Sequence, residues 1–256
     1  MTKQCINSLK YLSFVFVLLF FSNTIFSQNE NFTMSQVGCD LSQPWDVTYG
    51  PDDHLWVMES KSYELIRINP TTGSQQVVFD ASGLKNFSMY GGNIPQGGFT
   101  GLALHPDLLT GKPYVYLGYV YDFVSCVNGF ENCVFQTKVV RYDYNSSNNS
   151  LSNELVMVDT IPGSTDHNGG RMTIGDINGT PYLFFSVGDM GAGQFTNALR
   201  PNKAQNPNSY EGKTLRFNLE PDSDSGNFTN GSLTTILIRA LLKVPFGVSD
   251  TVIRRV

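Results

Sequence analysis

The sequence predicts an all-β fold, and three observations lead to that prediction. Apolar residues make up 41% of the 256 residues and charged residues only 15%, which excludes a disordered, charge-solvated chain. Phe and Tyr occur 18 and 12 times, and aromatic residues favour sheets. Short apolar runs alternate with turn sequences rich in Gly, Pro, Asn and Asp, and no amphipathic helical period of useful length appears between residues 28 and 234.

Residues 1–27 have the layout of a secretory signal peptide. Lys3 and Lys10 precede an apolar run at 12–21, and small polar residues then lead to Ser27. The run is shorter than the ~20 residues of a membrane-spanning helix, so an uncleaved anchor is the less favoured alternative. We expect cleavage after Ser27, no stable membrane insertion of the mature chain, and a periplasmic or extracellular location.

Charge and cysteine usage both fit an exported, acidic protein. The net charge is −5 and no basic patch is visible, so nucleic-acid binding is not expected. Cys126 and Cys133 flank a short loop between two strand-like runs, which predicts a local disulfide in an oxidising compartment. No other Cys and no His lies near them in sequence, which disfavours a metal site. Cys39 is then left without an assigned partner.

A cycle of short β-rich runs recurs three times, starting at Trp45, near Phe99 and near Gly170. We predict strands within 45–50, 51–60, 64–73 and 75–80; within 99–107, 112–122, 137–145 and 154–161; and within 170–179, 180–189 and 212–222. Units of about four antiparallel strands, spaced about 55–70 residues apart, are typical of β-propeller blades. A β-sandwich is the alternative, but it gives no reason for the cycle to recur.

Turn signals and matching sequences support the boundaries of these runs. Residues 50–53 (GPDD) and 69–73 (NPTTG) have the composition of turns. The run HLWVMES of the first cycle corresponds to YVYLGYVYD and YLFFSVGD in the other two. In the same way ELIRINP corresponds to KVVRYDYN and KTLRFNLEP. The strands of the three cycles are therefore expected to occupy equivalent positions.

The chain has three histidines, and only one stands in a segment that suggests chemistry. His54 follows two Asp residues in a turn and is expected to be solvated. His105 occupies a turn of the second cycle, where a structural role is favoured. His167 lies in the polar, Gly-rich segment 164–171 that enters the third cycle, and an imidazole with acids nearby suits a general base. The alternative for His167 is a loop histidine bonded to backbone.

Two further Gly-rich loops, 91–98 and 188–195, have an equivalent placement. Glycine lets the backbone approach a ligand closely, although tight turns explain the same composition. Neither loop matches a phosphate-binding motif. The sequence also lacks a G-x-S-x-G elbow and an H-E-x-x-H or Cys/His cluster, which leaves an α/β-hydrolase and a zinc enzyme unsupported.

Five ordered segments resemble the glucose/sorbosone dehydrogenase family: PWDVTYGPDDHLWV, PQGGFTGLALHPD, STDHNGGRMTIG, FFSVGDMGAGQ and YEGKTLRFNLEPD. The resemblance implies a six-bladed β-propeller and a secreted quinoprotein oxidoreductase. Such enzymes oxidise the C1 hydroxyl of an aldose and transfer hydride to pyrroloquinoline quinone (PQQ), which passes electrons to an external acceptor. A secreted propeller that binds a partner without redox activity is the alternative.

The resemblance also implies roles for individual residues. His167 matches the family's catalytic base, and Asp189 matches the acid that orients it. Contacts with the sugar substrate are implied for Gln96, Asp166, Gln194 and, as an apolar neighbour, Phe195. No residue of this chain is assigned to PQQ or to a metal, because the family's main PQQ contacts and its calcium-binding loops lie in a later part of the family sequence.

The resemblance covers part of the family's length. Residues 28–233 match its amino-terminal half, about three blades, whereas residues 234–256 match nothing in it. We expect this tail to be a truncated or out-of-frame end, with a short membrane-surface helix as the alternative. We also expect the chain alone to be inactive as a sugar dehydrogenase.

Overall fold

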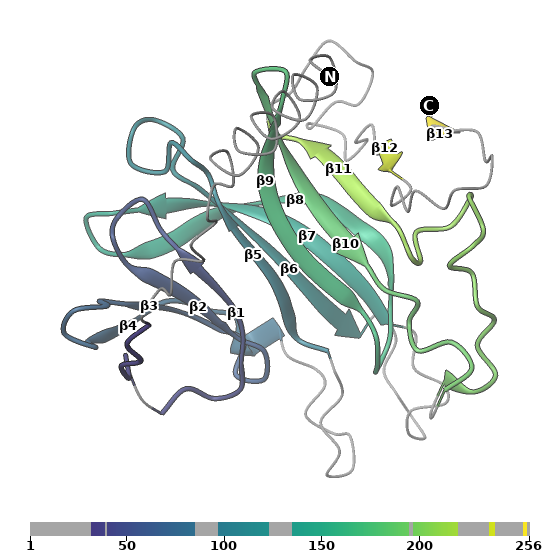
Figure 1. The fold of residues 1–256 in the computed structure, drawn as a ribbon, viewed down its shortest axis with the longest axis horizontal. Helices are drawn as coiled ribbons and strands as arrows, with labels where there is room; N and C mark the ends of the chain where they lie inside the picture. Colours follow the sequence, from purple (N-terminus) through teal and green to yellow (C-terminus); the bar gives the residue numbers. More distant parts are fainter. Residues whose placement is uncertain are drawn as a thin grey trace, which may run out of the picture. The chain divides into compact units, whose positions relative to one another are not determined.

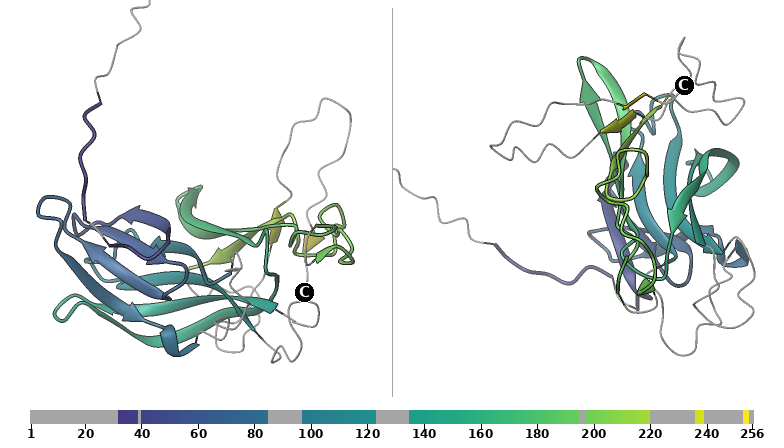
Figure 2. Two further views of the ribbon diagram at one scale, coloured as in Figure 1. Left: turned by 90° about the horizontal axis from the view of Figure 1, so that it is seen from below. Right: turned by 90° about the vertical axis from the view of Figure 1, so that its right-hand side faces the viewer.

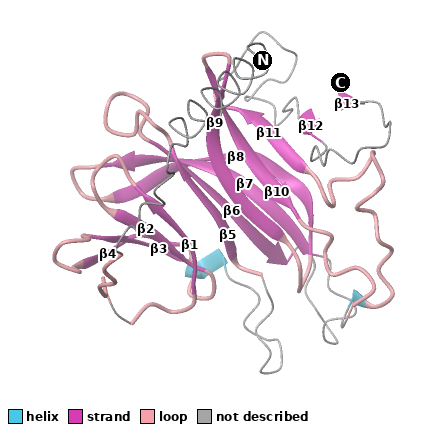
Figure 3. Ribbon diagram, viewed as in Figure 1, coloured by secondary structure: helices cyan, strands magenta, loops and turns pink. Residues whose placement is uncertain are grey.

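The computed structural model describes residues 32–38, 40–84, 97–122, 135–194, 197–219, 236–238 and 253–254. Strands dominate these ranges (Figure 3), and a short 3-10 helix, η1 (Ser82–Leu84), follows the fourth strand. Among the described residues no helix combines the length and the apolar character needed to cross a bilayer. The all-β prediction is confirmed for the unit that starts at Val37.

The strands form three antiparallel sheets in the order of the sequence (Figure 1). The first sheet contains β1 (Pro44–Tyr49), β2 (Leu55–Glu59), β3 (Glu64–Ile68) and β4 (Gln75–Asp80). The second contains β5 (Phe99–Leu104), β6 (Tyr114–Asp122), β7 (Phe135–Asn145) and β8 (Ser150–Gly163). The third contains β9 (Gly169–Ile177), β10 (Thr180–Val187), β11 (Thr214–Asn218), β12 (Ile236–Ile238) and β13 (Ile253–Arg254).

Each sheet corresponds to one of the three predicted cycles, and each strand pairs with its neighbour in sequence. Within the first sheet short turns join these pairs, which matches the turn sequences between the runs, whereas residues 188–213 connect β10 to β11. One difference concerns the tail after residue 233, which supplies β12 and β13 to the third sheet, with Leu215 opposite Leu237. Apart from this addition, the three sheets confirm the three-unit prediction.

The strands β5 and β6 of the second sheet are buried on both faces, which explains why their sequences are so apolar. Every residue of β5 is buried. Leu102 and Leu117 belong to the core cluster shared with the first sheet, whereas Ala103 and Tyr116 belong to the cluster shared with the third. A sheet covered on both faces reads as a continuous apolar run, whereas β1, in the first sheet, alternates between exposed and half-buried residues.

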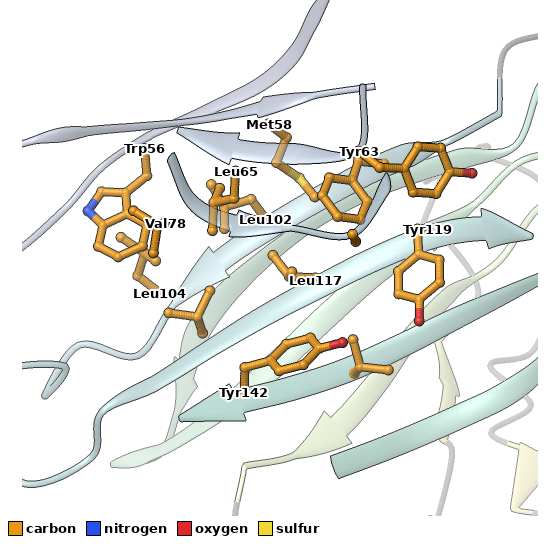
Figure 4. Packing of buried hydrophobic residues seen from close by; sticks show 14 of the residues in the cluster. Trp56, Met58, Tyr63, Leu65, Val78, Leu102, Leu104, Leu117, Tyr119 and Tyr142 are labelled. Atoms are coloured by element: carbon orange, nitrogen blue, oxygen red, sulfur yellow. The ribbon is translucent and has the colours of Figure 1, made fainter. Parts of the chain in front are cut away.

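Aromatic side chains fill the space between the first two sheets (Figure 4). The ring of Trp56 meets Tyr144 edge-on at 4.9 Å between centroids, and Phe79 lies 4.7 Å from Tyr142. Such pairs add about 0.5–1.5 kcal/mol each beyond the burial of their area. The hydroxyl of Tyr142 donates to Glu154 at 2.8 Å, and its burial raises the pKa of the phenol.

The first strands of the three sheets, β1, β5 and β9, contact one another, and Figure 2 gives two more views of them. Glycines allow β5 and β9 to meet backbone to backbone. A Cβ on Gly101 would lie 1.9 Å from the carbonyl oxygen of Gly170. A Cβ on Gly170, whose φ is 97°, would lie 2.2 Å from the Cβ of Thr100. Larger residues at Gly101 or Gly170 would force these two strands apart.

One carboxylate links all three of these strands. Asp46 of β1 accepts a hydrogen bond from the backbone N–H of Leu102 in β5 at 3.1 Å, and its other oxygen lies 2.5 Å from the guanidinium of Arg171 in β9. The Asp46 side chain is only 13% exposed. Burial raises its pKa above the ordinary value, and Arg171 opposes that change.

We predict that Asp46→Ala destabilises the chain by about 1–3 kcal/mol, because two charge-assisted bonds between sheets are lost. Arg171 is more than half exposed, so solvent replaces part of the lost interaction and places the effect toward the lower end. Urea unfolding of the two proteins measures the difference.

The control is Asp143→Ala, which removes a carboxylate whose bond to the Asn153 amide, at 2.9 Å, stays within the second sheet. We expect it to cost less than about 0.5 kcal/mol, as exposed substitutions usually do. Equal losses in the two variants would contradict a special role for Asp46.

Candidate functional site

Strand pairing brings two predicted site residues to the same end of the third sheet. β9 and β10 are antiparallel, with Gly169 opposite Val187. His167 lies two residues before Gly169, and Asp189 lies two residues after Val187. Residues just outside a paired position on two antiparallel strands are neighbours, so the hairpin itself places the imidazole beside the carboxylate.

Backbone hydrogen bonds continue beyond the paired strands and join the two loops. The N–H of Gly188 donates to the carbonyl of Asn168 at 2.9 Å, and the N–H of Met190 donates to that of His167 at 3.2 Å. A Cβ on Gly188 would lie 1.8 Å from the His167 carbonyl oxygen, so the approach requires glycine there. Both His167 (φ 50°) and Met190 (φ 64°) adopt the left-handed conformation, which is uncommon for residues with side chains.

The His167 ring has a defined partner on one side. Its Nδ1 lies 3.1 Å from Oδ1 of Asp189, which also accepts the N–H of Gly191 at 3.0 Å. An ionised carboxylate only accepts hydrogen bonds, so Nδ1 carries the proton of a neutral imidazole and Nε2 keeps its lone pair. The side chains of His167 and Asp189 are 40% and 32% exposed. The ring is thus held at Nδ1 while part of its surface stays exposed.

Asp166 supplies a second carboxylate on the other side of the ring. Its Oδ1 accepts the backbone N–H of His167 at 3.0 Å and lies 3.8 Å from Nε2. The side chain of Asp166 is 13% exposed. A negative charge at this distance stabilises the imidazolium that forms when Nε2 takes up a proton. The three side chains can therefore accept a proton from a hydroxyl and hold it.

Two buried polar residues that sequence reasoning did not single out close the loop 164–168. Asn168 accepts the N–H of Ser164 at 2.7 Å and donates to the carbonyl of Ser164 at 2.8 Å. The Ser164 hydroxyl donates to the carbonyl of Met190 at 3.0 Å. The only signal in the sequence is that two small polar residues, spaced four apart, frame the Asp-His pair in a Gly-rich segment.

The basic side chain of Arg200, near this loop, bonds to other groups of the protein. Arg200 donates to the carbonyl of Gly163, the last residue of β8, at 3.0 Å and lies 4.0 Å from the carboxylate of Glu211. Burial lowers the pKa of Arg200, and Glu211 opposes that change. The amide of Asn197 donates to the Thr165 hydroxyl at 3.3 Å. Residues 197–211 thus brace the loop from outside the hairpin.

The other predicted site residues are placed in part. Gln194 is exposed and its backbone N–H donates to the carbonyl of Gly191 at 2.9 Å, which keeps it in the loop that carries Asp189. Gln96 and Phe195 lie outside the described residues, although the carbonyl of Gly97, next to Gln96, accepts the Ser60 hydroxyl at 2.8 Å. The predicted disulfide residues Cys126 and Cys133, and Cys39, also lie outside the described residues.

The two other histidines also have polar partners. His105 is buried, and its Nδ1 accepts the N–H of Asp107 at 3.0 Å, so the predicted turn role is confirmed. The prediction that His54 is solvated was wrong. Its side chain is 20% exposed and its Nδ1 lies 3.0 Å from the guanidinium of Arg67. The cross-strand position of Arg67, which no local pattern indicates, explains the difference.

The comparisons with known proteins agree with this architecture. The sequence model described as "Glucose / Sorbosone dehydrogenase" matches residues 41–234. Quinoprotein glucose dehydrogenase B of Acinetobacter calcoaceticus is 29% identical over 205 residues, which cover 76% of this chain and 41% of that protein. The chain therefore spans less than half the length of this relative.

Solved structures show the same fold at low sequence identity. The PQQ-bound aldose sugar dehydrogenase of Streptomyces coelicolor has a TM-score of 0.55 and 22% identity, over 78% of this chain and 51% of that one. A crystal structure of a glucose dehydrogenase has a TM-score of 0.54 and 22% identity, over 78% of this chain and 53% of that one. Both structures are about twice as long as the region they share with this chain.

In a β-propeller, antiparallel meanders follow one another along the chain and pack face to face, with their first strands in contact. Polar loops precede these first strands. The three sheets described above have this arrangement. The predicted fold class is thereby confirmed, with three blades among the described residues. The match over residues 41–234 identifies the chain more closely: it belongs to the glucose/sorbosone dehydrogenase family.

We predict that Gly188→Ala separates the two loops, because the added methyl group would overlap the His167 carbonyl oxygen. The expected loss is about 1–3 kcal/mol of unfolding free energy, as for other over-packed sites. Thermal and urea unfolding provide the measurement.

The matched control is Gly83→Ala, since a Cβ there meets nothing within 4 Å. It should change stability by less than about 0.5 kcal/mol. If Gly188→Ala were as stable as Gly83→Ala, the close approach of the two loops would be refuted.

Proposed function

We propose that this chain is part of a secreted, PQQ-dependent sugar dehydrogenase in which His167 accepts the proton of an aldose C1 hydroxyl. The observation that carries the proposal is the 3.1 Å contact between His167 Nδ1 and Asp189, with the ring still 40% exposed. A histidine with a purely structural role is usually buried, whereas this ring keeps part of its surface exposed. Family membership supplies the reaction class.

The chemistry of the site follows from the tautomer that Asp189 imposes. With the proton on Nδ1, Nε2 of His167 has the lone pair that removes the hydroxyl proton. As the C1–H bond breaks, two electrons leave as hydride, and PQQ, when bound, supplies the acceptor for them. The proton stays on Nε2, where Asp166 stabilises the imidazolium.

Substrate orientation is assigned to the loops around this pair. Asp166 is close enough to the base to accept a second sugar hydroxyl without displacing Asp189. Gln194, in the loop after Asp189, offers an exposed amide that can donate and accept hydrogen bonds. We assign equivalent contacts to Gln96 and an apolar contact to Phe195.

The described residues fit the sugar side of the reaction better than the cofactor side. PQQ carries three carboxylates and needs cationic partners, whereas the site loops contribute Asp166 and Asp189. Arg200, nearby, is already bonded to Gly163. Within the described residues no group of three His, Cys, Asp or Glu side chains is arranged to hold a metal ion. We propose that the main PQQ and calcium contacts of a whole family member lie outside the described residues, in the later part of the family sequence.

The site of action follows from the amino terminus. Residues 1–27 have the organisation of a signal peptide, so we propose that the mature chain acts in the periplasm or outside the cell and reduces an external electron acceptor. Mass spectrometry of the exported chain should identify Gln28 as its first residue. A mature chain that retained Met1 would contradict export by cleavage.

We predict that the chain alone does not turn over glucose with PQQ, calcium and a reducible dye. Dye reduction should appear when it is mixed with a separately expressed polypeptide containing the remaining part of the Acinetobacter calcoaceticus enzyme. His167→Ala should then lower kcat by about 10²–10⁴-fold, because a general base contributes that much.

Three outcomes decide between the enzyme and a non-redox binding protein. Activity in the mixture that is lost with His167→Ala supports the proposal. Robust turnover by the chain alone would contradict its predicted dependence on the missing blades. Binding of aldose and PQQ by absorbance and calorimetry, with no turnover in a stably assembled mixture, would favour the binding protein.

A further inference from the structure

We propose that Ser164 and Asn168 are positioning residues that set the protonation of His167, an inference that rests on the proposed role of His167 as base. Both side chains are buried, with exposed fractions of 1% and 5%. Buried polar side chains in a loop are usually there to satisfy backbone groups. The geometry here does more, because the satisfied groups frame the catalytic pair.

The first part of this arrangement is a reciprocal pair of hydrogen bonds between the Asn168 side-chain amide and the backbone of Ser164. The Asn168 side chain accepts from the N–H of Ser164 at 2.7 Å and donates to the carbonyl of Ser164 at 2.8 Å. It thereby bonds both backbone groups of Ser164, as a neighbouring strand would. Ser164 and Asn168 thus close the loop at its two ends, and residues 165–167 form the turn between them.

The second part is the hydroxyl of Ser164, which joins the two loops. It donates to the carbonyl of Met190 at 3.0 Å and accepts the N–H of Asp166 at 3.2 Å. A serine hydroxyl has one proton to donate and lone pairs to accept, so both bonds can form together. Asp166 and the residue that follows Asp189 are thus fixed by the same oxygen atom.

The third part is the backbone conformation that these bonds enforce. His167 and Met190 both adopt the left-handed region, and the N–H of Met190 donates to the carbonyl of His167 at 3.2 Å. Left-handed residues with side chains persist where their surroundings hold them. In this conformation Nδ1 of His167 lies 3.1 Å from Oδ1 of Asp189.

Loss of the Asn168 amide or of the Ser164 hydroxyl should therefore loosen the hydrogen bond between Nδ1 of His167 and Asp189. The proton of the neutral ring would then distribute to Nε2, the nitrogen that must stay unprotonated for catalysis. The consequence is a smaller fraction of chains with a competent base.

The test uses the full chain labelled with ¹⁵N and the ring nitrogen shifts of His167, which report which nitrogen carries the proton. In the wild type we expect the proton on Nδ1. Asn168→Ala and Ser164→Ala should shift the population toward protonation of Nε2, whereas Ser164→Thr, which keeps the hydroxyl, should restore the wild-type shifts. Where Asn168→Ala does not fold, Asn168→Asp replaces it: Asp keeps an acceptor for the Ser164 N–H, while its second, charged oxygen faces the Ser164 carbonyl and cannot donate to it.

The control is Asn178→Ala, at the far end of the β9–β10 hairpin, where Asn178 is also left-handed. It should lower the melting temperature without moving the His167 shifts. Folded Ser164→Ala and Asn168→Asp variants with wild-type ring shifts would overturn the proposal, as would an equal change in Asn178→Ala.

The readout needs neither PQQ nor sugar, so its outcome is independent of the dehydrogenase assay. Altered tautomers with no activity in any mixture would leave the positioning role intact and refute the proposed reaction. In an active mixture, Ser164→Ala should lower kcat about 10–100-fold with little change in KM, since misplacement of a reacting group affects the chemical step. A change confined to KM would contradict the proposal.

Discussion

The direct backbone contact between β5 and β9 is the constraint on which the rest of the structure depends. Gly101 and Gly170 leave no room for side chains at the crossing, so the spacing of the second and third sheets is fixed at that point. The two apolar faces of the second sheet can then be filled by residues of fixed size. The loop 164–168 enters β9 next to this contact, which gives it a rigid base.

The candidate site is built on a strand that this contact holds in place. The hairpin register brings His167 and Asp189 together, and Ser164 and Asn168 supply the bonds that an additional strand would otherwise make. A loop built in this way combines an exposed ring with a fixed backbone. Fixed geometry lowers the reorganisation needed during a reaction, which is what a general base requires.

Much of the fold was predictable from sequence because its signals are local. Turn sequences, strand-length apolar runs and a recurring cycle each depend on neighbouring residues. The pairing of His167 with Asp189 was indicated by family resemblance, since the two residues lie 22 positions apart and only the β9–β10 register joins them. The bonds of His54 with Arg67 and of Asp46 with Arg171 depend on long-range packing, for which a single sequence carries no pattern.

The sequential order of the strands also governs how the molecule is made. Each strand of β1–β4 and of β5–β8 pairs with the strand just before or after it in the chain, so sequence separations between partners are short. Short separations cost little loop entropy and favour fast formation of contacts. A chain emerging from the ribosome can complete the first sheet before β5 is available, and this order allows assembly blade by blade from the amino terminus.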